Sequence, residues 1–253
     1  MNTDNMSILG LTIDYGPYGW LEGFDFGWTP NTTDRQHKRY RYGNQPNIGL
    51  WNLYQLANAL FPLIEEVAPL ESILKDYKTN FESQSLQLMK SKLGLFSSDK
   101  NDAKLIQNLE DTLQLSETDM TIFFRLLSDF TSEKNGFEMI KEAFYDIENV
   151  SETIKSKWQN WFGMYANRLQ QESLSAIERK LKMNAVNPKY VLRNYMAQLA
   201  IDAANLEDYS LIDELFQLLK KPYDEQTNHQ KWFAKRPDWA RDKVGCSMLS
   251  CSS

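Results

Sequence analysis

Histidine and cysteine, the side chains that most often bind zinc, are scarce in this sequence. Two of each occur among 253 residues, and neither His37 nor His229 has a second His or Cys at zinc-ligand spacing. Cys246 and Cys251 both lie near the end of the chain, which excludes a disulfide scaffold and favours a reducing compartment. The sequence therefore predicts neither a zinc protein nor a disulfide-stabilised secreted one.

Long apolar runs and a positive charge balance are also lacking. No stretch approaches the roughly 18 consecutive apolar residues of a membrane span, and no charged segment followed by an apolar one opens the chain as a secretion signal would. The net charge of −6 argues against a mainly nucleic-acid-binding surface. We therefore expect neither membrane nor nucleic acid as a partner. The 42% hydrophobic and 13% aromatic residues are ample for a packed core.

Glycine is concentrated at one end of the chain, and this defines three regions. Seven of the eleven glycines lie within the first 49 residues, where Ile8–Ile13 is typical of a short strand and residues 15–47 of a long ordered loop. A long loop in a compact domain is usually functional. We assign residues 1–48 to this strand-and-loop region, 49–222 to a helical body and 223–253 to a tail without periodicity.

The helical body follows from apolar residues that recur every three or four positions. The pattern predicts a mainly α-helical fold. Expected helices are 48–66, which Pro62 kinks or ends; 70–95, with Gly94 as C-cap; the pair 102–116 and 119–132, with Ser116 as N-cap; 150–183; one beginning after Pro188, with Asn187 as N-cap; and one ending before Pro222.

Three oxygen-bearing side chains, Asp4, Asn5 and Asp14, flank the predicted first strand. Mg²⁺ prefers oxygen ligands and is usually held by one or two carboxylates together with substrate phosphates. In protein kinases the metal ligands are the Asn of the catalytic loop and the Asp of an Asp-Phe-Gly motif, in that order. Asn5 and the tripeptide Asp14-Tyr15-Gly16 repeat that order. The alternative is a turn at a strand end, in which Asp14 bonds its own backbone.

Five sequence blocks together favour the metal-site interpretation. They are "NTDNMSILGLTIDYGPYGW", "NQPNIGLWNLYQLANAL", "NPKYVLRNYMAQLAI", "PYDEQ" and the terminal "SCSS". In this order the chain resembles, over its whole length, the SelO family, whose members are pseudokinase-fold proteins that act as protein adenylyltransferases. The resemblance implies that Asp4 is the general base, that Asn5 and Asp14 bind Mg²⁺, and that Asp14 also faces the ATP phosphates. The alternative for Asp4 is that it only orients the loop.

The same resemblance implies a fold and a reaction. The expected fold is the mainly helical C-terminal lobe of a protein-kinase-like protein, with a short β and loop region at its start carrying the metal-binding motif. The expected reaction transfers AMP from ATP to Ser, Thr or Tyr hydroxyls of protein substrates, with Mg²⁺ or Mn²⁺. Two rivals remain open: kinase-type phosphoryl transfer by the same metal site, and a non-catalytic all-α interaction fragment.

Members of the family are about twice as long, and the small lobe that covers ATP has no counterpart in these residues. We therefore expect the chain to be a C-terminal portion, with a separately encoded N-terminal lobe as a candidate partner. Without that lobe it should bind Mg-ATP weakly and transfer no AMP. The expected location is the cytoplasm in a bacterium, whereas eukaryotic relatives are mitochondrial.

Three further features have both a functional and a purely structural interpretation. The resemblance makes Cys251 a redox candidate, because some relatives have selenocysteine at that place; the alternative is a mobile tail thiol. The basic residues from Arg35 to Arg41 fall where kinase folds place the activation loop, which favours a protein-facing loop over a nucleic-acid site. For Arg193 we prefer a buried side chain that bridges helices.

Overall fold

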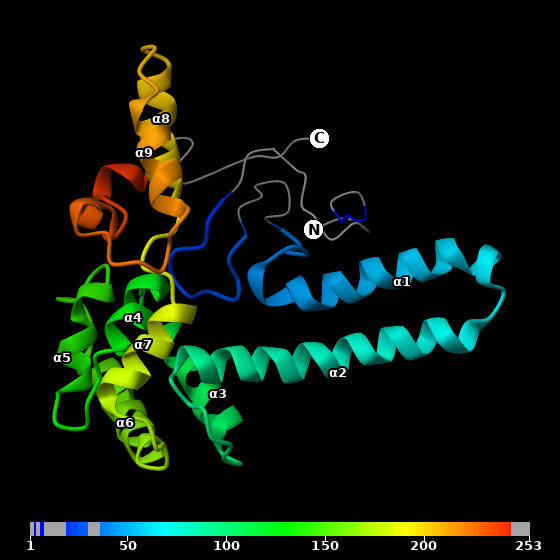
Figure 1. Cartoon of the computed structure of the whole chain (residues 1–253), viewed down its shortest axis with the longest axis horizontal. Helices are drawn as coiled ribbons and strands as arrows, with labels where there is room; N and C mark the ends of the chain where they lie inside the picture. The colour runs from blue at the N-terminus through cyan, green and yellow to red at the C-terminus, as the bar shows by residue number, and fades with distance from the viewer. Residues whose placement is uncertain (1–2, 4–5, 8–18, 30–35, 244–253) are drawn as a thin grey trace. The chain divides into compact units, whose positions relative to one another are not determined.

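A computed structural model of the chain describes residues 3, 6–7, 19–29 and 36–243 (Figure 1). These residues form two compact units, one made of 25–29 and 36–87 with the few described residues up to 19, and the other of 20–24 and 88–243. Within the described ranges the structure is helical, and β pairing is confined to two isolated bridges, Gly23 with Asp119 and Thr118 with Phe144. The prediction of a mainly α fold is confirmed.

The first unit is built on two long antiparallel helices, α1 (Gln45–Ile64) and α2 (Val67–Lys92) (Figure 1). The end of α2, residues 88–92, belongs to the second unit. Pro46 lies in the first turn of α1, where its missing N–H costs nothing. Pro62 lies inside α1, which ends two residues later, before Glu65 in the left-handed conformation. The Tyr77 hydroxyl of α2 donates to the Pro46 carbonyl at 3.1 Å. Gly49 permits this approach, because a Cβ there would lie 2.7 Å from the hydroxyl oxygen.

The second unit has an aromatic core. Its helices are α3 (Asp102–Leu113), α4 (Met120–Leu127), α5 (Gly136–Ile140), α6 (Glu152–Leu169), α7 (Ala176–Val186), α8 (Asn194–Ala204) and α9 (Ser210–Leu219). Trp158 and Trp161 of α6 are fully buried, and Trp161 stacks on Tyr165 with ring centroids 5.0 Å apart. Phe123 of α4 packs against both tryptophans. Large aromatic side chains bury much apolar surface each, so α6 organises this core.

The region 150–183, predicted as one helix, is two. Helix α6 ends at Leu169 and α7 begins at Ala176. Ser175 and Glu178 form a capping box, in which each side chain accepts from the other residue's backbone N–H. This local cap starts a new helix and explains why the apolar periodicity does not continue as one element.

Two predicted N-caps were also wrong. Asp119, not Ser116, caps α4, and its carboxylate accepts from the Ile122 N–H at 3.0 Å. Asn187 ends α7 instead of starting the next helix, and residues up to Arg193 are non-helical before α8 begins at Asn194. The N–H groups of Lys189 and Tyr190 donate to the Pro222 carbonyl, so these residues form a non-helical junction before α8.

Helices α8 and α9 form a second, smaller core with the segment that follows them (Figure 1). Met196 of α8 and Leu218 of α9 are fully buried there and pack with Trp232, which belongs to a 3₁₀ helix, Thr227–Trp232. The described part of the tail is therefore folded onto the helical unit although its sequence has no periodicity. None of the described helices is both long and apolar enough to cross a membrane.

Candidate functional site

The four site residues predicted from the sequence, Asp4, Asn5, Asp14 and Cys251, all lie outside the described residues. Among residues 3, 6–7, 19–29 and 36–243, no three His, Cys, Asp or Glu side chains are grouped to hold a metal. The structure does describe Met6, which lies between the two predicted metal ligands, and residues 20–24, which follow them. Met6, directly after Asn5, accepts a hydrogen bond at its sulfur from the buried Asn52 side chain of α1.

On the other side of the motif, residues 20–24 are attached to the second unit by backbone hydrogen bonds. The Trp20 N–H donates to the Asn194 side-chain oxygen at 3.1 Å, at the first residue of α8. The Phe24 N–H donates to the Thr118 carbonyl, and the Met120 N–H donates to the Glu22 carbonyl. The chain that follows Asp14-Tyr15-Gly16 is thus held by Trp20 at the first residue of α8, and by Glu22 and Phe24 at the residues that begin α4.

A buried ionic cluster reinforces this attachment. Its members, from five separate parts of the second unit, are Glu22, Asp119, Tyr145, Arg193 and Arg236; we call it the Arg193 cluster. Both terminal nitrogens of Arg193 donate to the Asp119 carboxylate, and the distance from Nη2 to Oδ1 is 3.1 Å. Arg193 Nη1 also lies 3.8 Å from Glu22, and Arg236 Nη1 lies 3.3 Å from the other oxygen of Glu22. Asp119 is fully buried and Arg193 is 2% exposed. The expectation that Arg193 is buried and bridges helices is confirmed.

The electrostatics of this cluster follow from burial. Burial raises the pKa of Glu22 above its ordinary value, although Arg193 and Arg236 oppose the shift. The pKa of Tyr145 is raised by burial and by the charges of Asp119 and Glu22, so its hydroxyl is a neutral donor lying 3.3 Å from both carboxylates. Burial lowers the pKa of Arg193, but the Asp119 carboxylate outweighs burial and raises it. Two carboxylates balance two guanidinium groups, an arrangement that holds chain segments together.

The sequence analysis singled out one member of this cluster, Arg193. A second member, Asp119, precedes the apolar run of α4 and has the signal of an N-cap, by which it could have been found. Glu22, Tyr145 and Arg236 carry no such signal, because their partners are distant in the sequence.

Two sequence blocks quoted for the family resemblance meet in the second unit. Lys189, from "NPKYVLRNYMAQLAI", donates to Glu225 of "PYDEQ" at 2.7 Å, and Arg125 of α4 donates to the other oxygen of Glu225 at 2.6 Å. The N–H groups of Lys189 and Tyr190 both donate to the Pro222 carbonyl. These blocks therefore form one structural junction beside α4.

A second buried ionic cluster joins the end of α2 to α3 and α6. Asp102 accepts from Arg168 at 2.6 Å and lies 3.2 Å from Lys90 Nζ, and Arg168 donates to Glu172 at 2.8 Å. Burial acts to raise the pKa of Asp102 and of Glu172. Hydrogen bonds from Arg168 and from neighbouring serine and backbone groups outweigh it, so that both pKa values are lowered. Both carboxylates stay ionised in the folded chain.

This second cluster predicts loss of stability in acid. Because the folded-state pKa of Asp102 and of Glu172 lies below the ordinary values of 3.8 and 4.5, the stabilisation is present above those values and is lost as pH falls through the folded-state pKa. We expect the free energy of unfolding, measured by urea titration at a series of pH values, to fall steeply below pH 4.5. Asp102→Asn should flatten this dependence, whereas Asp76→Asn, at an exposed position of α2, should leave it unchanged. An equally steep slope in Asp102→Asn would contradict the assignment.

Comparison with known proteins places the chain in a family. The sequence model of the family described as "Protein adenylyltransferase SelO" matches residues 1–220. That range includes the Asp4, Asn5 and Asp14 positions and the anchored residues 20–24. The chain belongs to the SelO family.

Curated relatives named "Protein nucleotidyltransferase YdiU" match the chain over its full length. The protein of Flavobacterium johnsoniae is 62% identical, that of Aromatoleum aromaticum 49% and that of an Azoarcus species 48%. This chain covers 49%, 48% and 49% of those proteins, so it spans about half the length of the curated relatives it matches.

Proposed function

We propose that this chain forms the C-terminal lobe of a protein-kinase-like adenylyltransferase, which transfers AMP from ATP to Ser, Thr or Tyr hydroxyls of proteins. The observation that carries the proposal is the family match over residues 1–220, which includes the ordered pair of Asn5 and Asp14-Tyr15-Gly16. The anchoring of residues 20–24 in the second unit supports it, because a metal-binding tripeptide must be held in place by the chain that follows it.

In the proposed reaction each predicted residue has one role. The hydroxyl oxygen of the substrate protein forms a bond to the α-phosphorus of ATP, and the bond from that phosphorus to the pyrophosphate oxygen breaks. Asp4 takes the hydroxyl proton, and pyrophosphate leaves with the electron pair. Asn5 and Asp14 supply the oxygen ligands that Mg²⁺ or Mn²⁺ prefers, and the bound cation would neutralise phosphate charge. Cys251 is proposed as a redox-sensitive group outside this reaction.

The proposal includes a requirement for more polypeptide than these residues. Two metal ligands and a base on one wall cannot enclose a triphosphate, and the relatives contain as much chain again. We propose that ATP is enclosed between this lobe and the other half of the family protein. The three bacterial relatives favour a cytoplasmic location over a mitochondrial one.

The proposed reaction is tested by following which phosphate of ATP reaches protein. The chain, joined to the half of the Flavobacterium johnsoniae relative that lies outside the match, is incubated with Mg²⁺ and ATP labelled at the α- or the γ-phosphorus. We expect label on protein from the α position only. Label from the γ position would establish phosphoryl transfer instead, and a folded, ATP-binding fusion that transfers neither label would refute catalysis. The chain alone should transfer no AMP, and robust transfer by it would refute the need for the other half.

A further inference from the structure

The helical hairpin of α1 and α2 carries more apolar surface than its own unit covers. From Leu53 to Met89 no residue is fully buried, although the two helices together include Leu, Ile, Phe and Tyr at many positions. Leu63 is 82% exposed and Ile73 is 63% exposed. In the second unit, by contrast, each helix from α3 to α9 places at least two side chains in a core. The hairpin is therefore exceptional among the described elements.

Helix α1 is apolar around more than one face. Leu50 and Tyr54 border the groove between the helices, whereas Leu56, Leu60 and Leu63 follow each other at spacings of four and three and form another stripe. A surface helix needs one apolar stripe, and a helix that is apolar on most sides is normally buried. Since most of the stability of a helix in a protein comes from packing its apolar face, α1 requires a second packing partner.

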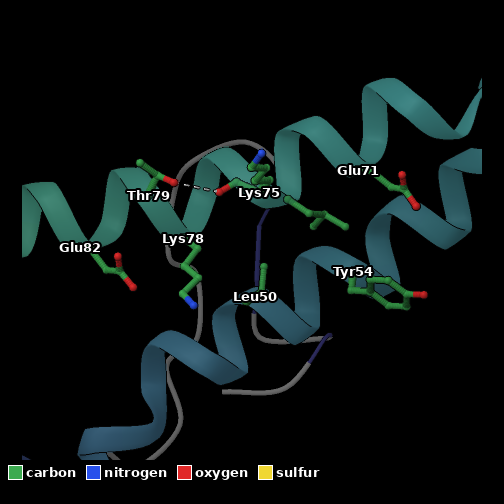
Figure 2. Close-up of a pocket in the computed structure, with 8 residues that line it drawn as sticks. Leu50, Tyr54, Glu71, Lys75, Lys78, Thr79 and Glu82 are labelled. Atoms are coloured by element: carbon green, nitrogen blue, oxygen red, sulfur yellow. Dashed lines mark hydrogen bonds between the residues drawn. The ribbon is translucent and has the colours of Figure 1, made fainter.

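The groove between the two helices is also open. It has a volume of about 570 Å³. Leu50 and Tyr54 of α1, Leu74 of α2 and charged side chains of α2 line it. Figure 2 shows Leu50 extending from α1 towards α2, and Lys78 extending from α2 towards α1. The charged residues of α2 that line the groove carry both signs, in the order Glu71, Lys75, Lys78 and Glu82. This mixture of signs is unlike the basic face of a helix that binds anionic membranes and suits a folded polypeptide with mixed charge.

We infer that the uncovered side of the α1–α2 hairpin is the docking surface for the other half of the SelO-family polypeptide, the part that lies outside this chain. The chain covers 49% of its Flavobacterium johnsoniae relative, so in that relative a second half of similar length is joined to the matching residues. The hairpin has the longest run of described residues without a buried member, and exposed apolar patches of this kind mark interaction sites. The inference rests on family membership and not on the proposed AMP transfer, because its readout is binding.

The test is co-purification with a defined partner. The half of the Flavobacterium johnsoniae relative outside the match is tagged and co-expressed with this full chain. The molar mass of the complex is then measured by light scattering after gel filtration. We expect a 1:1 complex. Leu63→Glu should reduce the retained chain by about 10-fold or more, because a leucine that becomes buried contributes at least one such factor and a buried carboxylate adds a further cost.

Matched controls separate docking from general surface effects. Leu206, after α8, is also 82% exposed, so Leu206→Glu makes the same change at the same exposure in the second unit. Leu181→Glu does so within a helix, α7, at a residue 67% exposed. Both variants should retain the partner as the parent chain does. If Leu63→Glu binds normally, or if Leu206→Glu abolishes binding while Leu63→Glu does not, the inference is overturned.

Hydrogen exchange gives a second measurement that does not depend on a soluble separate half. In the fusion of this chain to the same half, amides of α1 should exchange at least 10-fold more slowly than in the chain alone, and Leu63→Glu should remove that protection. Equal protection of α1 in the chain alone would mean that its own residues already cover the helix. A chain that dimerises through α1, with dimers lost in Leu63→Glu, would assign the surface to a second copy. Either result overturns the inference.

Discussion

Replacing Arg193 with alanine is expected to lower the free energy of unfolding of the second unit by about 3–5 kcal/mol, the cost of removing one partner from a buried ion pair. Arg193 is the only group in its cluster that donates from two nitrogens to the fully buried Asp119. Without it, Asp119 and the neighbouring Glu22 would be two buried carboxylates with one remaining guanidinium, Arg236, which lies beside Glu22. Urea titration followed by fluorescence of the buried Trp158 and Trp161 measures the change.

Arg241→Ala is the matched control for this substitution. Arg241 Nη1 lies 3.0 Å from Glu117, but both side chains are about 40% exposed, and such pairs contribute about 1 kcal/mol or less. Arg193→Lys should fall between the two, because lysine keeps the charge without the two-pronged geometry. In Arg193→Ala, hydrogen exchange should also become faster at the Phe24 and Met120 amides, which attach residues 20–24 to α4. An Arg193→Ala variant no less stable than Arg241→Ala would contradict the role given to this cluster.

Replacing Asp14 with alanine is expected to lower AMP transfer by about 100-fold or more, on the scale of removing one group that stabilises charge in a transition state. The proposal gives Asp14 a metal-binding role beside the ATP phosphates, so its loss removes a ligand that no other proposed residue replaces. The assay is transfer of α-labelled phosphate to protein by the chain fused to the other half of its Flavobacterium johnsoniae relative. Raising the Mg²⁺ concentration should recover part of the activity if the defect lies in metal binding.

Asp25 supplies the control for Asp14. It is exposed, lies in the same N-terminal part of the chain, and its carboxylate accepts only from the Gly27 N–H at 2.7 Å among the contacts the structure describes. Asp25→Ala should therefore leave AMP transfer within about twofold, since a local turn contact of this kind contributes little. Equal activities of the Asp14 and Asp25 variants would favour the other interpretation of Asp14-Tyr15-Gly16, a turn at the end of a strand.

Local patterns in the sequence predicted most helices but not all of their ends. The apolar periodicity of α1 and α9 and the stop at Gly94 after α2 agree with the structure, in which Gly94 has a φ of +69°. The division of 150–183 was missed although Ser175 and Glu178 carry a capping box, a signal that is local and readable. The missed start of α8 differs in kind, because the N–H groups of Lys189 and Tyr190 are bonded to the carbonyl of Pro222, which is distant in the sequence.

The sequence by itself determined the family and the order of the candidate site residues, since Asn5, Asp14-Tyr15-Gly16 and the later blocks are contiguous motifs. It also determined the mainly helical class, because periodicity is a property of neighbouring residues. Only the tertiary structure decided that Arg193 pairs with Asp119, 74 positions away, and that Glu22 and Arg236 join them. It alone also decided that, among the described residues, none from Leu53 to Met89 in α1 and α2 is buried. The physical reason is that ion pairing and burial depend on which distant segments meet, and no local pattern records that meeting.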